Sequence, residues 1–238
     1  MEKSKLQSFI NRYYLAGNCE AVVLKNNSNA VCCDLIDADQ TVVGKIQWKT
    51  TPFMNGELGI NHTGALIKML SAVGENLNID IQEASGKNYA MKISEGSTKA
   101  TFMLADTTVI PGVPTINEEP EYQVSIDLND EFTSKFIKAK NALPDANNFA
   151  VQVQDGQIKF IINYSTISSD NISFEITGGS FPMENIEPIC FSADKLKEIL
   201  VANKGDSGKM FISSDGLARI DFTGNDFESN YWLVQLQN

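Results

Sequence analysis

The chain has 238 residues, 42% of them hydrophobic, and a formal net charge of −11 at pH 7. This length suffices for one large core or for two domains of roughly 110 residues each. Taken as a whole, the negative charge argues against nucleic-acid binding, because affinity for DNA comes mainly from Lys and Arg. No run of about 18 apolar residues occurs and the start lacks a signal-peptide core, so we expect a protein of the cytoplasm without membrane spans.

The first half of the chain predicts two amphipathic helices among short strands. The first helix is expected over Lys3–Ala16, where apolar residues recur at helical spacing on one face and Gly17 stops the pattern. The second is expected over Asn61–Val73, with Asn61 as its N-cap and Gly74 at its end. Strands are expected at Glu20–Lys25, Ala30–Ile36, Val42–Trp48, Asn78–Glu83, Asn88–Ser94 and Lys99–Ala105.

A segment rich in proline and acid divides the chain near its middle. Thr107–Glu121 contains three of the seven prolines, Pro111, Pro114 and Pro120, so it cannot continue a helix or lie inside a sheet. We therefore predict a domain at 1–106, a connector at 107–121 and a second domain at 122–238.

The second half repeats the plan of the first. One helix is expected from Asn129 or Asp130 to Leu143 and another from Ser192 to about Lys204, each with a polar N-cap. The helix starts are about 58 residues apart in the first half and about 62 in the second, which is typical of a duplicated domain. Strands are expected at Tyr122–Asp127, Phe149–Gln154, Gln157–Asn163, Ile172–Thr177, Lys209–Ser213, Ala218–Thr223 and Tyr231–Leu236.

Basic residues are concentrated in the four predicted helices. The windows 3–16, 61–73, 130–143 and 192–204 hold ten of the nineteen basic residues but only four of the thirty acidic ones. Lysine is a good helix former on a solvated face, but glutamate is equally good and is scarce there. The pattern favours one surface of helices that faces a polyanion, with the acidic remainder turned away from it.

Several stretches together resemble the sliding DNA clamps of the proliferating cell nuclear antigen type, and most of all the shorter clamps of tailed phages. ATFMLADTTVIPGVP (Ala100–Pro114) resembles the last strand of a first clamp domain running into the connector. FSADKLKEIL (Phe191–Leu200) is similar to the last clamp helix, and DGLARIDF followed by NYWLVQL (Asn230–Leu236) to the terminal strands. The resemblance implies an α+β clamp fold of two similar domains, each with two helices packed on antiparallel sheets.

The resemblance also implies a function. It points to a homotrimeric ring that encircles duplex DNA without reading its sequence and tethers a replicative DNA polymerase, after opening by a clamp-loader ATPase. A phage-encoded protein of this kind works in the host cytoplasm. The side chains expected to line the pore are Lys5, Arg12, Lys68, Lys135, Lys138, Lys140, Lys197 and Lys204.

Two further surfaces follow from the resemblance. A groove for a short partner peptide is expected between the connector and the last strand, rimmed by Glu118, Glu119 and Glu121 and lined by Ile36, Val109, Ile110, Val113, Ile116, Trp232 and Val234. Trp232 as a plain core residue is the alternative. Subunits are expected to join by pairing Lys99–Ala105 with Ile172–Gly178, with Thr101, Phe102, Phe174 and Ile176 in the interface.

Other chemistry finds little support in the sequence. The single histidine, His62, has no partner for a catalytic dyad, and the four cysteines show no metal-binding spacing, so we expect free thiols, no cofactor and no enzyme activity. Two alternatives remain open. A β-rich virion or tail protein would share the composition without needing basic helices, and a nuclease using scattered carboxylates would cleave DNA with a divalent metal.

Overall fold

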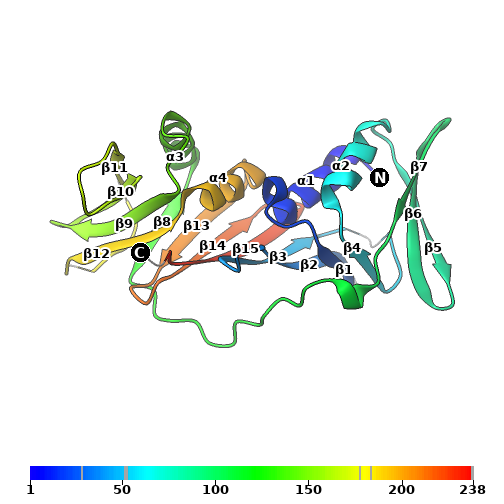
Figure 1. Cartoon of the computed structure of the whole chain (residues 1–238), viewed down its shortest axis with the longest axis horizontal. Coiled ribbons are helices and arrows are strands. Elements are labelled where there is room, and N and C mark those ends of the chain that lie inside the picture. Colours follow the sequence, from blue (N-terminus) through cyan, green and yellow to red (C-terminus); the bar gives the residue numbers. More distant parts are fainter. Residues whose placement is uncertain (28, 51–52, 177, 183, 237–238) are drawn as a thin grey trace. The chain divides into compact units, whose positions relative to one another are not determined.

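The computed structural model describes residues 1–27, 29–50, 53–176, 178–182 and 184–236 (Figure 1). Its helices are α1 (Lys3–Tyr14), α2 (Thr63–Ser71), α3 (Asp130–Ala142) and α4 (Ala193–Ala202), with two single 3-10 turns, η1 (Leu15–Gly17) and η2 (Thr107–Val109). Its strands are β1 (Val22–Asn27), β2 (Ala30–Ile36), β3 (Val42–Trp48), β4 (Glu57–Ile60), β5 (Asn78–Ala84), β6 (Lys87–Glu95), β7 (Thr98–Met103), β8 (Val124–Leu128), β9 (Asn148–Gln154), β10 (Gln157–Ile162), β11 (Ile172–Ile176), β12 (Ile186–Ser192), β13 (Ser207–Ile212), β14 (Leu217–Thr223) and β15 (Phe227–Val234).

Contacts divide the chain into two compact units. Unit 1 is Met1–Pro114 with Asn225–Ser229, and unit 2 is Thr115–Gly224 with Asn230–Asn238. The boundary at Pro114 falls inside the segment that the sequence predicts as a connector. Figure 1 shows residues 110–123 as a long green coil that follows η2 without helix or strand.

Unit 1 contains two antiparallel sheets and a pair of helices. One sheet has the order β4-β1-β2-β3, and the other has the order β5-β6-β7. Helix α1 packs on α2, β2 and β3, while α2 also contacts β7. The apolar face of α1 is buried as its spacing predicts, with Phe9 and Tyr13 at 0% exposure and Phe9 against Trp48.

Unit 2 has the same kind of architecture. One sheet has the order β11-β10-β9-β12, and the second runs β15-β14-β13-β8. Helices α3 and α4 pack together, α3 on β8 and α4 on β9. A cluster of phenylalanines fills the core, in which Phe149 contacts Phe136, Phe160 and Phe191.

The two units share one strand order. The four strands after the first helix of each unit lie in the order fourth, first, second, third, which is β4-β1-β2-β3 in unit 1 and β12-β9-β10-β11 in unit 2. The three strands after the second helix lie in chain order in both units, as β5-β6-β7 and β13-β14-β15. Strand β8 precedes α3 and pairs with β13, and its counterpart in unit 1 is the single bridge between Glu2 and Asn76. This repeat confirms the predicted α+β class with two similar halves.

Both helix caps predicted for unit 2 are present, whereas α2 begins differently from the prediction. Asn129 accepts a hydrogen bond from Phe132 N–H at 2.9 Å, and Ser192 accepts one from Lys195 N–H at 3.4 Å. Helix α2 starts at Thr63 rather than at Asn61. The reason is a distant partner, because the Glu20 carboxylate accepts from Gly64 N–H at 3.0 Å and the Glu20 carbonyl accepts from the Thr63 hydroxyl.

The sequence does not predict strands β4 and β12. Strand β4 has four residues and includes Gly59, where a Cβ would clash with the carbonyl oxygen of Ala105 across an isolated bridge. Strand β12 contains Pro188 and an irregular register between Ile186 and Ile189. Both features weaken the alternating pattern by which strands are recognised. The predicted strand end at Thr177 lies outside the described residues.

Candidate functional site

Six of the eight basic residues predicted to face DNA have accessible side chains: Lys5 in α1, Lys68 in α2, Lys135 and Lys138 in α3, Lys197 in α4 and Lys204 just after it. They are thus distributed over all four helices. In the described part of the chain, Lys68, Lys138 and Lys204 have no ion-pair partner. Three others are partly neutralised, because Lys5 pairs with Asp226 at 3.3 Å, Lys135 with Glu131 at 2.7 Å and Lys197 with Glu198 at 3.7 Å.

Arg12 does not belong to this surface, so its prediction is corrected. The residue is 4% exposed, and its guanidinium donates to the carbonyl oxygen of Ser8 at 2.9 Å and lies 4.1 Å from the centre of the Phe227 ring. A planar cation on an aromatic face is stabilising inside a unit. The structure therefore gives Arg12 a packing role rather than a position for contacting phosphates.

Lys140 requires the same correction. Its side chain is 4% exposed, its Nζ lies 2.9 Å from the Asp194 carboxylate, and it donates to the Pro144 carbonyl oxygen at 2.7 Å. The ion pair joins α3 to α4 and the second bond holds the end of α3. Helical spacing alone does not separate Lys140 from Lys138, which lies two residues earlier and is exposed.

Strand β7 forms one edge of the three-stranded sheet and carries a row of outward-facing backbone groups. Leu104 N–H donates to the Tyr89 carbonyl, so Leu104 and Tyr89 form a hydrogen-bonded pair. Hydrogen-bonded and non-hydrogen-bonded pairs then alternate along β6 and β7 from this point. In that alternation, the N–H groups of Lys99, Thr101 and Met103 point away from β6. The side chains of these three residues are also exposed.

Strand β11 is the corresponding edge in unit 2. Asn163 N–H donates to the Asn148 carbonyl. The backbone N–H and C=O groups of alternate β10 residues therefore point to β9, and those of the residues between them point to β11. It follows that the N–H groups of Ser173 and Glu175 point away from β10. Edges with free backbone donors are templates for pairing with another strand.

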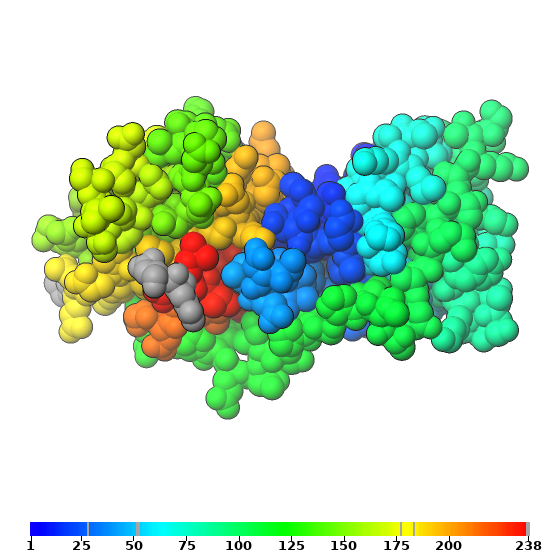
Figure 2. All heavy atoms as spheres, in the orientation of Figure 1, coloured from blue at the N-terminus to red at the C-terminus, as the bar shows by residue number. Residues whose placement is uncertain are grey.

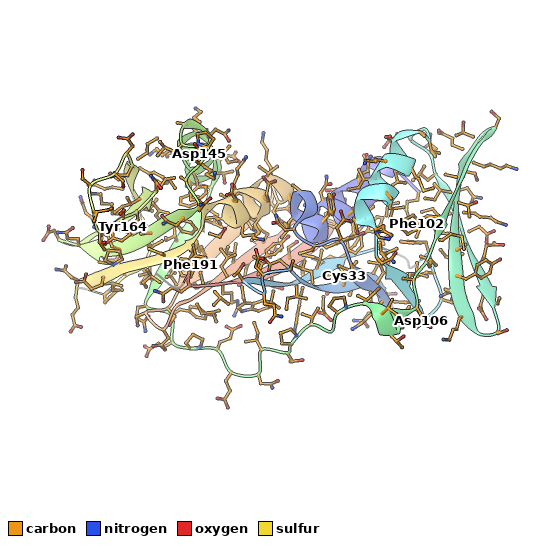
Figure 3. All side chains as sticks on the ribbon, viewed as in Figure 1. Cys33, Phe102, Asp106, Asp145, Tyr164 and Phe191 are labelled. Carbon is orange, nitrogen blue, oxygen red and sulfur yellow. The ribbon has the colours of Figure 1, made fainter. Side chains whose placement is uncertain are left out.

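The four residues predicted for the subunit interface lie on these two edge strands but differ in orientation. Thr101 is exposed, Ile176 is half-buried and Phe102, labelled in Figure 3, is buried in unit 1 at 5% exposure. Phe174 is half-buried and its ring stacks on Phe160 at 5.6 Å between centres. Changes at Phe102 and Phe174 would therefore damage a core as well as an edge.

The first part of the connector lies against the sheet β4-β1-β2-β3 of unit 1. Asp106, labelled in Figure 3, accepts from Lys87 Nζ at 2.7 Å and caps η2 through Thr108 N–H at 3.0 Å. These contacts lower the pKa of Asp106, with the Lys87 hydrogen bond as the largest cause. Figure 2 shows green atoms of this segment on the surface. The connector is thus anchored where it leaves β7.

Four of the predicted groove residues belong to this part of unit 1. Ile110 is buried, Val113 and Ile36 are half-buried and Val109 is 69% exposed. Ile36 lines a cavity of about 350 Å³ together with Pro111 and Gly112. A second cavity of about 300 Å³ lies between Ile110, Val113 and the side chains of β1 and β2.

The remaining three groove residues, Ile116, Trp232 and Val234, belong to unit 2. Ile116 is half-buried and Val234 is 43% exposed, but Trp232 is only 8% exposed. The indole N–H of Trp232 donates to the Glu119 carboxylate at 2.9 Å, and Arg219 donates to the other oxygen of that carboxylate at 2.9 Å. Glu119 thus ties the second part of the connector to β14 and β15, a contact that the sequence pattern does not predict.

Two further features, a metal site and a membrane span, were sought in the described part of the chain. No group of three or more His, Cys, Asp or Glu side chains there is arranged to hold a metal ion. None of its helices has the length and apolar character of a membrane span.

Comparison with known proteins identifies the fold through structure rather than sequence. No protein-family model and no curated protein matches the chain by sequence. A structure titled as the C-terminal region of FEN-1 bound to the A. fulgidus clamp PCNA matches with a TM-score of 0.75 and 16% identity, over 100% of this chain and 97% of that one. The proliferating cellular nuclear antigen of Entamoeba histolytica matches at 0.73 with 12% identity, over 99% of this chain and 96% of that one.

A third match is the PCNA2-PCNA3 complex of Sulfolobus tokodaii, with a TM-score of 0.72 and 12% identity over 99% of this chain and 97% of that one. All three similarities cover nearly the whole length of both chains. The protein therefore has the sliding-clamp fold of the proliferating cell nuclear antigens.

Proposed function

We propose that this protein is a sliding clamp that encircles duplex DNA as a homotrimer and tethers a DNA polymerase and other partners. The observation that carries the proposal is the presence of accessible lysines on every helix of a clamp fold, in a chain whose net charge is −11. Lysines on flexible stems contact phosphates without reading sequence, which suits a ring that moves along DNA. Retention by topology does not require high affinity.

The repeat of strand order supports the assembly of a ring. In unit 1, Phe227–Ser229 of β15 lies beside β3, with Lys49 N–H donating to the Asp226 carbonyl at 2.8 Å and Phe227 packing on Trp48. By position in the repeat, β3 corresponds to β11, and β15 corresponds to β7. Strands β11 and β7 are the edges with outward-facing N–H groups. If β11 of one copy paired with β7 of another copy, this pairing would resemble the contact between β3 and β15 within one chain.

The connector supports a role in binding partners. One of the similar structures is titled as a clamp with a bound C-terminal region of FEN-1. In this chain the connector borders two open cavities in unit 1 and presents Val109 to solvent. We propose that short peptides of a DNA polymerase, and of a clamp-loader ATPase that opens the ring, dock there. The protein itself would be a scaffold without enzyme activity or cofactor.

Covalent closure of the ring around DNA tests this function without a loader. Thr101→Cys and Ser173→Cys, in a Cys32→Ser background, place thiols on the two exposed edges for a flexible bismaleimide. The protein is cross-linked in the presence of nicked circular plasmid or the same plasmid made linear, and then denatured. We expect protein to remain on the circle and to be released by a single double-strand cut.

Two sets of substitutions, with equal change in charge, test the pore. Lys68→Glu, Lys138→Glu and Lys204→Glu together should reduce the protein retained on circles at least about tenfold. Lys45→Glu, Lys92→Glu and Lys159→Glu, on strands, should leave retention unchanged. The proposal would be contradicted if retention were equal on circular and linear plasmid, or if cross-linked rings held no circular DNA. Cross-linked chains of unlimited length would favour a structural protein of a virion or tail.

A further inference from the structure

The Glu119 contact forms a built site for a carboxylate within unit 2. Two donors converge on it, the guanidinium of Arg219 and the nearly buried indole of Trp232, each at 2.9 Å from a different oxygen. The Glu119 side chain is 27% exposed, so the carboxylate is partly accessible to solvent. Charged hydrogen bonds of this geometry are stronger than neutral ones.

The two donors are held in place independently of Glu119. Asp221 binds Arg219 through two bonds, at 3.0 Å from Nε and 2.7 Å from Nη2, and Asn230 donates to Asp221 at 2.7 Å. The Arg219 guanidinium also lies 5.7 Å from the centre of the Phe211 ring. Removal of Glu119 would therefore leave a preorganised site rather than a collapsed one.

The Tyr122 hydroxyl is a third polar group beside the Glu119 carboxylate. The Tyr122 hydroxyl is buried, and this burial, followed by the charge and hydrogen bonding of Glu119, raises its pKa. Its ring lies 5.9 Å from Phe211, the residue beneath Arg219. Glu119 thus lies beside three donor groups, and a carboxylate from another molecule in its place would meet the same three groups.

We propose that Arg219, Trp232 and Tyr122 form a carboxylate-recognition site, which the connector occupies with its own Glu119. A partner peptide bearing an Asp, Glu or C-terminal carboxylate displaces Glu119 and releases this part of the connector. The inference rests on the proposed partner-binding role of the connector. A partner without an acid would leave the nearly buried indole N–H of Trp232 and Nη1 of Arg219 without the acceptor that Glu119 provides, and this cost selects for acidic peptides.

The test uses Glu119→Ala protein and the probe N-acetyl-glutamate N-methylamide, with its glutamine analogue as the neutral control. The readout is the indole ¹⁵N–¹H resonance of Trp232, assigned by loss of the signal in Trp232→Phe. In Glu119→Ala we expect this resonance to move from its wild-type position and to return as the glutamate probe saturates. The glutamine analogue should require about tenfold more probe.

Matched variants define the site. Wild-type protein and Glu118→Ala should not respond to the probe, because Glu119 fills the site, and Glu119→Ala with Arg219→Gln should not respond because the cation is missing. An unchanged indole resonance in Glu119→Ala, or an equal response to both probes, would overturn the proposal. Glu119→Ala changes neither the helices nor the edge strands, so its retention on circular DNA should equal that of wild type. Loss of retention in both proteins would therefore count against the ring function and not against the carboxylate site.

Discussion

The guanidinium of Arg12 in α1 lies 4.1 Å from the centre of the Phe227 ring, a residue 215 positions later in the chain. Phe227 in turn packs on Trp48 of β3, so the start of β15 is part of the core of unit 1. The N-terminal half of the chain is therefore completed by residues from the C-terminal end.

Arg12→Ala should destabilise the protein by about 2 kcal/mol, because a buried cation–π contact and the packing of the arginine stem are both lost. The measurement is the free energy of unfolding in urea. Lys138→Ala, at an exposed position of α3, is the control and should change that free energy by less than about 0.5 kcal/mol. Equal stabilities of the two variants would show that Arg12 has no role in the core.

Proline at either edge strand should abolish assembly and leave each chain folded. The N–H groups of Thr101 and Ser173 point away from their own sheets, so Thr101→Pro and Ser173→Pro remove donors that only a second chain would use. Light scattering should report a single-chain mass with unchanged circular dichroism. Thr101→Ala and Ser173→Ala retain the N–H groups and should assemble like wild type, and assembly of both proline variants would refute the proposed edges.

Tyr122 should make the stability of unit 2 sensitive to alkaline pH. Burial, followed by the negative charge of Glu119, raises the pKa of Tyr122 to about 12, whereas an unfolded tyrosine titrates near 10. The folded state thus holds its proton longer than the unfolded state, so this contribution is full below about pH 10 and is lost as pH rises to about 12. Glu119→Gln should lower the Tyr122 pKa measured by ¹³C NMR, and Glu118→Gln should not. A Tyr122 that titrates near 10 in wild type would contradict this prediction.

The adjacent thiols of Cys32 and Cys33 should react at different rates. Both lie on β2 and face opposite sides, with Cys32 half-buried and Cys33, labelled in Figure 3, at 2% exposure. Burial raises the pKa of Cys33 well above its usual value. Native protein with a thiol reagent at pH 8 should modify Cys32 first, and Cys33 only on unfolding. Modification of both at one rate would place β2 differently from the structure.

The sequence is informative where a local signal determines the structure. The helical spacing in α1, the cap at Asn129 and the neighbouring strands predicted at Phe149–Gln154 and Gln157–Asn163 depend on neighbours within a few residues, and all are present. The similar helix spacing in the two halves likewise predicts a duplicated domain, and the two units share one strand order.

The remaining features depend on partners far away in the chain. Arg12 and Lys140 share the helical positions of exposed bases and are buried only because Phe227 and Asp194 meet them. The start of α2 is capped by Glu20, and Trp232 is covered by Glu119, each through a contact over more than 40 residues. A pattern read along one segment contains no information on such pairs.

Solution mass shows whether the protein forms a ring, because a ring is a closed assembly with a fixed number of subunits. Multi-angle light scattering over a range of micromolar concentrations should give a plateau at three times the 26.2 kDa of the chain, with no growth beyond it. A mass that stays at one chain throughout, or one that increases without limit as concentration rises, would contradict the account.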